Sequence, residues 1–210
     1  SLISEPVYDD IQPYGEKYFI TRKGETSGLL TSAGGEILAP VANEIKIFND
    51  SLFFFRSGPS WGAVNINRQT VIPAKYETFK KLSDHYIKLV ANNKFYIYSI
   101  AFGNIISQGT YEDYYAFSKR YLLVKKDRQL GLIDWCGNLV LQPQYDEIQA
   151  HEDNTFRASF KNKWGLVQVR DSVLLPFEYD YIAPLKGNIC AAKKNGLFEI
   201  NLEKIGYHKL

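Results

Sequence analysis

Short stretches of alternating apolar and polar residues, separated by small polar turns, run along the whole chain. The segment from Tyr145 to Tyr179 shows the pattern most clearly, and it predicts strands at residues 145–149, 155–160, 164–169 and 172–176. Residues 161–163 and 170–171 separate these strands and are turns of hairpin length. No segment has the apolar spacing of a helix. The pattern predicts an all-β protein with about four short antiparallel strands in each unit.

This unit recurs six times with a period of 34 or 35 residues. Self-similarity at a fixed period is the signature of a repeat architecture, so residues 1–210 are predicted to form a single repeat domain. Five of the six copies open on a short phrase in which a tyrosine is followed by an acidic residue, and the second copy has Ala42-Asn43 there. The six anchors are Tyr8, Ala42, Tyr76, Tyr111, Tyr145 and Tyr179.

A glycine stands about 20 residues after the anchor in most copies. Within a strand, glycine usually marks a bulge or the close approach of a neighbour, so a structural role is predicted. In the sixth copy we align Gly196, which comes early and predicts a shortened copy. A proline near the end of most copies is predicted to end a strand. The structural set is Gly28, Gly62, Gly131 and Gly165, together with Trp61 and Trp164, which precede two of these glycines.

The phrases Trp61-Gly62-Ala63-Val64, Leu130-Gly131-Leu132-Ile133 and Trp164-Gly165-Leu166-Val167 resemble bacterial WG repeats. The resemblance covers nearly the whole chain. The third copy departs from it, with Phe95-Tyr96 in place of Trp-Gly and Ser107-Gln108-Gly109-Thr110 in place of the proline corner. The resemblance implies a repetitive β-domain used for binding or display in bacterial, often envelope-associated, proteins, and it brings no catalytic residues.

Two assemblies fit six such units. A six-bladed β-propeller is our prediction, because neither end of the chain shows a polar capping unit and a closed ring needs none. The segments Leu2-Ile3 and 205–207 both resemble a fourth strand and can meet to close that ring. An open, solenoid-like stack of β-repeats is the alternative, which the short period favours.

The composition and the motifs that are missing argue against several classes of function. With 25 basic and 23 acidic side chains, the net charge of +2 creates no strong field for nucleic acid or an anionic membrane. The sequence contains neither a signal peptide nor an apolar run long enough to cross a membrane. Zinc spacings, a nucleophile elbow and a P-loop are all missing, so we expect no cofactor, no metal and no enzymatic activity. Cys136 and Cys190 are interpreted as small core residues without a disulfide.

Two sets of charged residues recur. An acid or its amide follows each anchor, and it is interpreted as a turn cap in preference to a ligand of a bound cation. Basic residues recur near the turn between the second and third strands, where they predict a basic rim, although charged hairpin tips are also ordinary. The acids and amide are Asp9, Asn43, Glu77, Glu112, Asp146 and Asp180, and the rim residues are Arg22, Arg56, Lys125, Lys126, Lys161, Lys163, Lys193 and Lys194.

The irregular third copy is the candidate binding site, because a repeat that departs from its consensus often does so to make contacts. An equal alternative is that its aromatic rings fill the space left by the missing tryptophan. The candidate residues are Lys94, Tyr96, Tyr98, Phe102, Tyr114 and Tyr115. We predict a non-enzymatic binding or scaffold module that contacts a protein partner through a face or edge of the assembly. The alternative is a module that binds cell-surface glycan or cell wall through exposed aromatic residues.

Overall fold

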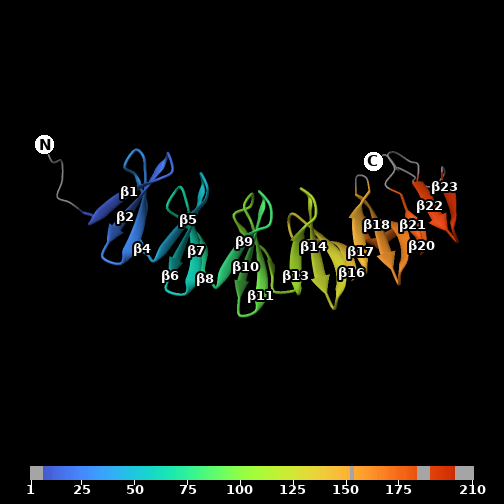
Figure 1. The fold of residues 1–210 in the computed structure, drawn as a ribbon. Helices are drawn as coiled ribbons and strands as arrows, with labels where there is room; N and C mark the ends of the chain where they lie inside the picture. The colour runs from blue at the N-terminus through green and yellow to red at the C-terminus, as the bar shows by residue number, and fades with distance from the viewer. Residues whose placement is uncertain (1–6, 152–153, 184–189, 202–210) are drawn as a thin grey trace. The chain divides into compact units, whose positions relative to one another are not determined.

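The computed structural model confirms the all-β repeat architecture (Figure 1). It describes residues 7–151, 154–183 and 190–201. The chain divides into two compact units, residues 1–105 (unit 1) and 106–210 (unit 2), with the division inside one strand. The segments predicted to close a ring lie outside the described residues, so closure stays a prediction. Among the described residues there is no helix long and apolar enough to cross a membrane.

Unit 1 contains two complete sheets and most of a third, and in every sheet the strands follow chain order as an antiparallel meander. The sheets are numbered 1 to 6 along the chain. Sheet 1 consists of β1 (Asp10–Tyr14), β2 (Tyr18–Lys23), β3 (Thr26–Thr31) and β4 (Glu36–Ala42); sheet 2 of β5 (Glu44–Asn49), β6 (Leu52–Ser57), β7 (Ser60–Asn65) and β8 (Thr70–Tyr76); sheet 3 of β9 (Thr78–Lys81), β10 (Tyr86–Ala91), β11 (Lys94–Ser99) and β12 (Asn104–Gln108).

Unit 2 repeats this organisation, and in the described residues its last sheet has three strands. A single 3₁₀ turn, η1 (Val169–Asp171), interrupts the strands. Sheet 4 consists of β13 (Asp113–Ala116), β14 (Tyr121–Lys126), β15 (Gln129–Asp134) and β16 (Leu139–Tyr145); sheet 5 of β17 (Glu147–Ala150), β18 (Thr155–Phe160), β19 (Lys163–Gln168) and β20 (Ser172–Tyr179); sheet 6 of β21 (Tyr181–Ile182), β22 (Cys190–Lys194) and β23 (Leu197–Asn201).

Within each unit, the core lies between successive sheets. Successive side chains of a strand point to opposite faces, and in sheets 2 and 5 both faces are covered by neighbouring sheets. Phe53 packs in a cluster with residues of sheet 1, whereas its neighbour Phe54 packs in a cluster with residues of sheet 3. Leu166 and Val167 divide in the same way between sheets 6 and 4. A strand residue at either parity is therefore buried, which explains why so many aromatic residues fit inside the strands.

The third and fourth strands of sheets 1, 2, 4 and 5 share a shift in their pairing register. This shift explains why the third strand has a glycine at the facing position. In sheet 4, Leu130 pairs with Tyr145 but Leu132 pairs with Leu141, so the fourth strand carries two extra residues there. This bulge brings the backbone of residues 141–143 over Gly131, where a Cβ would lie 2.6 Å from the Leu141 carbonyl oxygen. The predicted close approach is confirmed. Pro143 lies inside β16 and does not end the strand, because the bulge accommodates it.

The register also corrects our alignment of the sixth copy. Gly196 has a φ of +83° and occupies the turn between β22 and β23. Ala192 pairs with Glu199, as Ala158 pairs with Gly165 in sheet 5, so Glu199 occupies the position of the strand glycine. The sixth copy is therefore not shortened up to that point. The error arose because a turn glycine and a strand glycine are indistinguishable in a single sequence.

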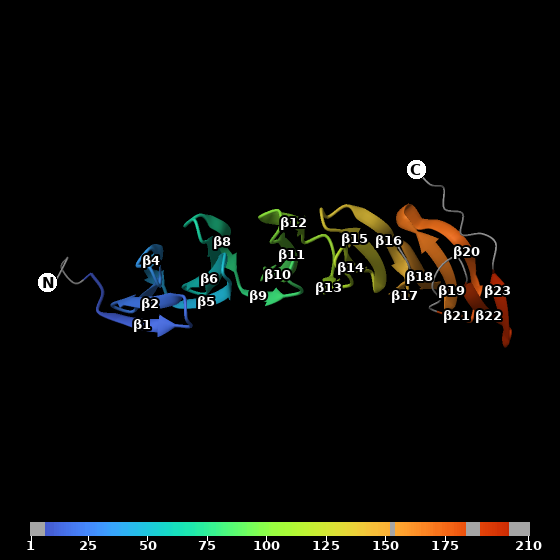
Figure 2. The ribbon, with the colours of Figure 1, turned by 90° about the horizontal axis from the view of Figure 1, so that it is seen from above.

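The meander gives every sheet two different ends. The second hairpin, between the second and third strands, lies at the same end as the links between sheets, which we name the link end. The first and third hairpins lie at the other end, which we name the loop end. Figures 1 and 2 show this arrangement within each unit. Each anchor marks a link, since Tyr145 ends β16 and Glu147 begins β17.

Candidate functional site

The acids and the amide that follow the anchors lie at the link end, and each bonds to a hairpin of its own sheet. In all six copies the side chain after the anchor accepts a hydrogen bond from a backbone N–H of the second hairpin. The bonds run from Gly24 to Asp9 (2.7 Å), Gly58 to Asn43 (2.8 Å), Asn92 to Glu77 (2.8 Å), Asp127 to Glu112 (2.8 Å), Asn162 to Asp146 (3.1 Å) and Asn195 to Asp180 (3.0 Å). The interpretation of these residues as turn caps is confirmed.

No cation site accompanies these caps in the part of the chain that the structure describes. There, no three His, Cys, Asp or Glu side chains lie close enough together to hold a metal ion. The recurring acids serve the hairpins next to them.

Several basic residues of the link end are paired with acids beside them. Arg56 Nε lies 3.3 Å from Glu44 Oε2, Lys163 Nζ lies 2.6 Å from Asp180 Oδ1, and Lys194 Nζ lies 3.0 Å from Glu178 Oε2. Asp180 responds to this contact: the hydrogen bond from Lys163 is the largest cause that lowers the pKa of its carboxyl group below the ordinary value. Arg22, Lys126 and Lys161 are exposed at the same end of their sheets, while Lys125 and Lys193 are half-buried. Local acids thus offset part of the predicted basic rim.

The aromatic cluster predicted in the third copy is divided by the fold. Lys94, Tyr96, Tyr98 and Phe102 belong to unit 1, whereas Tyr114 and Tyr115 belong to unit 2. Tyr98 and Tyr114 are almost completely buried, so neither can contact a ligand on the surface. Both were predicted as exposed contact residues and are interior instead: Tyr98 packs in the core between sheets 2 and 3, and the Tyr114 hydroxyl group shares a buried hydrogen bond with Ser107.

The remaining members of the cluster have different environments. Tyr96 packs edge-on against Tyr76 with 5.5 Å between ring centroids, which supports the alternative that the rings of this copy fill space. Lys94, Phe102 and Tyr115 are exposed. The tryptophans behave as structural residues: Trp61 is buried and packs against Phe79, and Trp164 is half-buried beside the core of sheets 5 and 6.

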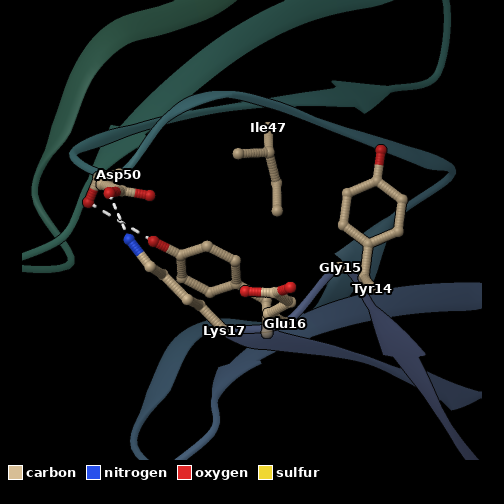
Figure 3. Close-up of a pocket in the computed structure, with 7 residues that line it drawn as sticks. Tyr14, Gly15, Glu16, Lys17, Ile47 and Asp50 are labelled. Atoms are coloured by element: carbon tan, nitrogen blue, oxygen red, sulfur yellow. Dashed lines mark hydrogen bonds and ion pairs between the residues drawn. The ribbon is translucent and has the colours of Figure 1, made fainter.

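The loop end of unit 1 contains a pocket of about 440 Å³ between the first hairpins of sheets 1 and 2 (Figure 3). The first hairpin of sheet 1 supplies residues 14–18, and sheet 2 supplies Ile47 and Asp50. Figure 3 shows Tyr14 on one side of the pocket and the Lys17–Asp50 pair on the other, with Ile47 and Glu16 between them. The ring of Tyr18 is buried, while Tyr14 is 38% exposed. The pocket is therefore lined by one fixed and one accessible aromatic ring.

Charged groups surround this pocket. Lys17 Nζ lies 2.5 Å from Asp50 Oδ2, and the Tyr18 hydroxyl donates a hydrogen bond of 3.5 Å to the Asp50 carbonyl oxygen. The Asp50 carboxylate raises the pKa of the Lys17 ammonium group, so this lysine stays charged. Burial raises the pKa of the Tyr18 hydroxyl, which stays protonated at neutral pH. Glu16 adds a second carboxylate without an ion pair to any described residue. Two carboxylates and one ammonium group leave a net negative charge.

Unit 2 contains a second pocket, of about 290 Å³, at the corresponding place between sheets 4 and 5. Its lining begins at Phe117, six residues after the anchor Tyr111, as Tyr14 is six residues after Tyr8. Tyr121 corresponds to Tyr18 and donates its hydroxyl hydrogen to Asn154 Oδ1 on the next sheet. The polar lining differs: Arg120 stands at the position of Lys17, and the described lining includes His151 but no carboxylate. The scaffold thus presents the same hollow twice with different chemistry.

Neither pocket was predicted from the sequence. The search for repeated positions favoured the link end, whereas the first-hairpin loops hardly resemble one another, as Tyr14-Gly15-Glu16-Lys17 and Phe117-Ser118-Lys119-Arg120 show. That variability inside a constant frame was the available signal. Cys136, interpreted as a core residue, is exposed in the third hairpin of sheet 4, and the side chain of Cys190 lies outside the described residues.

Comparison with solved structures returns matches of low similarity. Hsv2 of Kluyveromyces lactis is 12% identical with a TM-score of 0.34, over 84% of this chain and 66% of that one. A eukaryotic initiation factor is 8% identical with a TM-score of 0.38, over 90% of this chain and 60% of that one. The N-terminal domain of Nup159 is 12% identical with a TM-score of 0.32, over 94% and 74%. The chain thus spans two thirds or less of the length of the first two proteins. We base no argument on TM-scores this low.

Comparison with protein families is more specific. No match was found among curated proteins. A family model described as WG containing repeat matches residues 131–164 and 165–198. The two matches begin at the strand glycines Gly131 and Gly165, and the first ends at Trp164. Residues 131–198 therefore match two WG repeats in tandem.

Proposed function

We propose that this chain is a non-enzymatic binding module that contacts a protein partner through the loop end of its sheets. The observation that carries the proposal is the difference between the two ends. The link end repeats the same turn caps in every copy, whereas the loop end combines variable hairpins with a pocket in each unit. A constant scaffold with variable loops at one end is a common arrangement for recognition.

The turn residues of the hairpins also favour the loop end, although the strand residues Val41, Leu197 and Phe198 are exposed near the link end. Four third hairpins each expose one large apolar residue: Ile66 is 40% exposed, Phe102 48%, Trp135 55% and Val169 37%. The second hairpins, at the link end, carry only Gly, Pro and polar or charged residues in the corresponding turns. Aromatic and large apolar residues are enriched at the centres of protein interfaces, where they contribute most of the binding energy. This contrast supports a protein partner.

We further propose that the copies before residue 131 are divergent WG repeats of bacterial origin. Sheets 1 and 2 share the register shift of sheets 4 and 5, and Gly28 and Gly62 lie under the same bulge as Gly131. The third copy lacks both the glycine and the proline corner. Because the bulge is what excludes a side chain at the glycine position, loss of the corner removes the need for glycine, and Tyr96 is tolerated there.

Affinity capture with paired variants of the full chain tests the binding surface. The loop-end variant carries Trp135→Ser, and the link-end control carries Lys126→Ser; both positions are exposed residues of unit 2. We expect a protein that is retained by the wild type and by the control but lost from the loop-end variant. The retained protein is then purified and its affinity for all three chains measured by calorimetry. Loss of binding in the control alone would move the interface to the basic rim and overturn the proposal.

A further inference from the structure

We infer that the pocket of unit 1 receives a cationic side chain, an arginine, from the partner. This inference deepens the proposed function and rests on it. The pocket is the hollow between the first hairpins of sheets 1 and 2 that Figure 3 shows. Its chemistry points to a positive group, for three reasons that concern charge, aromatic surface and hydrogen bonding.

Charge is the first reason. Glu16 and Asp50 place two carboxylates at the pocket, and Lys17, which interacts with both of them, supplies a single positive charge. The Lys17–Asp50 contact uses Oδ2 of Asp50, and no described residue bonds to Oδ1 or to Glu16. A cation entering the pocket therefore meets one uncompensated charge and two carboxylate groups with bonding capacity left. A ligand anion would be repelled by the same groups.

Aromatic surface is the second reason. Tyr14 is 38% exposed, and its ring borders the pocket opposite the carboxylate of Asp50. A cation over a tyrosine ring is attracted by the electron density of the ring face. This chain already uses such contacts, since Lys46 Nζ lies 4.7 Å from the ring centroid of Trp61. The ring of Tyr14 offers an incoming cation the same kind of contact.

Geometry favours arginine over lysine. A guanidinium group is planar, so it can lie against a tyrosine ring while its edge donates two hydrogen bonds to a carboxylate. The pocket presents these two features together, with the ring of Tyr14 on one side and Glu16 close by. Ile47 supplies apolar surface for the methylene groups of the side chain. An ammonium group could also lie over the ring, but it could not stack flat against it and at the same time donate two parallel hydrogen bonds to one carboxylate.

The pocket of unit 2 serves as an internal control. It occupies the corresponding place in its unit, with Arg120 at the position of Lys17, and none of the described residues that line it carries a carboxylate. The inference therefore predicts arginine binding in the first pocket and none in the second. If first-hairpin loops bound arginine whatever their sequence, both pockets would bind it.

Nuclear magnetic resonance on the ¹⁵N-labelled full chain tests the inference, with N-acetyl-arginine amide as the probe. The amide signals of Gly15 and Lys17 should shift and saturate, with a dissociation constant on the order of millimolar for so small a ligand. N-acetyl-citrulline amide has nearly the same shape without the charge, and it should leave these signals unchanged. The amides of Ser118 and Thr155 in the second pocket should not respond to either probe.

Substitutions at three exposed positions of the pocket should change the affinity for the arginine probe, two of them lowering it and one raising it. Glu16→Gln and Tyr14→Ala should each weaken binding of the arginine probe by about 2- to 5-fold, the size of an exposed ion pair or cation–π contact. Lys17→Gln should tighten it by about the same factor, because it releases Asp50. Tyr14→Phe keeps the ring and should bind as the wild type does. Thermal unfolding of each variant checks that the fold is intact.

Three results would overturn the inference: no saturable shift with arginine, equal shifts with citrulline, or weaker binding after Lys17→Gln. The capture experiment with Trp135→Ser tests the proposed function separately. If the arginine probe fails while Trp135→Ser still abolishes capture of the partner, the loop end remains the interface and only the chemistry of this pocket is wrong. If the probe binds but Trp135→Ser captures the partner normally, the arginine site stands and the interface proposal fails.

Discussion

Adding a single methyl group to Gly131 is expected to destabilise unit 2 by about 1–4 kcal/mol. The Cβ of Gly131→Ala would lie 2.6 Å from the Leu141 carbonyl oxygen, 2.8 Å from Pro143 N and 3.0 Å from the Gln142 carbonyl carbon. All three are backbone atoms, so no change of rotamer relieves the clash. Restoring an ordinary contact of 3.4 Å requires β16 to move by about 0.8 Å.

The magnitude follows from what that movement disturbs. Leu141 is fully buried and Val140 nearly so, and both belong to the core between sheets 4 and 5. Overpacking of such a core costs about 1–3 kcal/mol, and weakening a hydrogen bond of the β15–β16 ladder adds about 1 kcal/mol. The restriction that alanine places on the unfolded chain returns about 0.4–1 kcal/mol. The net loss remains in the range given above.

Urea unfolding measures this loss, with circular dichroism and tryptophan fluorescence for the whole chain; two of its three tryptophans, Trp135 and Trp164, lie in unit 2. Gly35→Ala is the matched control. The only close neighbour of a Cβ there is the Thr31 side-chain oxygen at 3.2 Å, so the change should stay within about 0.5 kcal/mol of the wild type. If Gly131→Ala were equally mild, the claim that the bulge excludes a side chain would be refuted.

Four further predictions concern the turns, the ion pairs and the assembly. Glu112→Ala removes the acceptor for the Asp127 amide and should cost about 1 kcal/mol in urea unfolding, whereas Glu112→Gln should cost less. Arg128→Gly should stabilise the fold by about 0.5–1 kcal/mol in the same assay, because its φ of +66° suits glycine. Carboxyl titration by nuclear magnetic resonance should show a lowered pKa for Asp180 that rises towards the ordinary value in Lys163→Gln; the stabilisation from this pair is present above the unfolded pKa and is lost as pH falls through the folded pKa. A closed ring predicts a radius of gyration of about 17 Å by small-angle scattering, and a clearly larger value would favour the open stack.

The repeated features of the fold were predictable from the sequence because the same physical task recurs in every copy. The period located all six sheets, and the acid after each anchor was correctly interpreted as a cap for a turn. The strand glycine was predicted to mark a close approach, and the contacts of Gly131 confirm it. Each of these features is local, or pairs residues at a fixed sequence separation, so one chain contained enough copies to reveal it.

The candidate site was not predictable in the same way. Tyr98 and Tyr114 looked like surface aromatics, since a sheet with one solvated face exposes every second residue, but Tyr98 packs in the core between sheets 2 and 3 and Tyr114 is fully buried. The pocket around Tyr14 depends on Ile47 and Asp50 from the next sheet, and no motif connects those positions. The residues at the pocket positions differ from copy to copy, so repeated sequence patterns do not identify them.

The offset between the sequence repeats and the sheets has a practical consequence for dividing or extending this protein. A matched unit such as 131–164 begins inside β15 and ends inside β19, so it joins half of sheet 4 to half of sheet 5. Duplicating that unit by recombination would splice two half-sheets together and restore a whole one at the junction. A shortened protein, in contrast, should end after residue 145 or 179, where a sheet is complete, because ending at 164 would leave the apolar second strand of sheet 5 without its full partner.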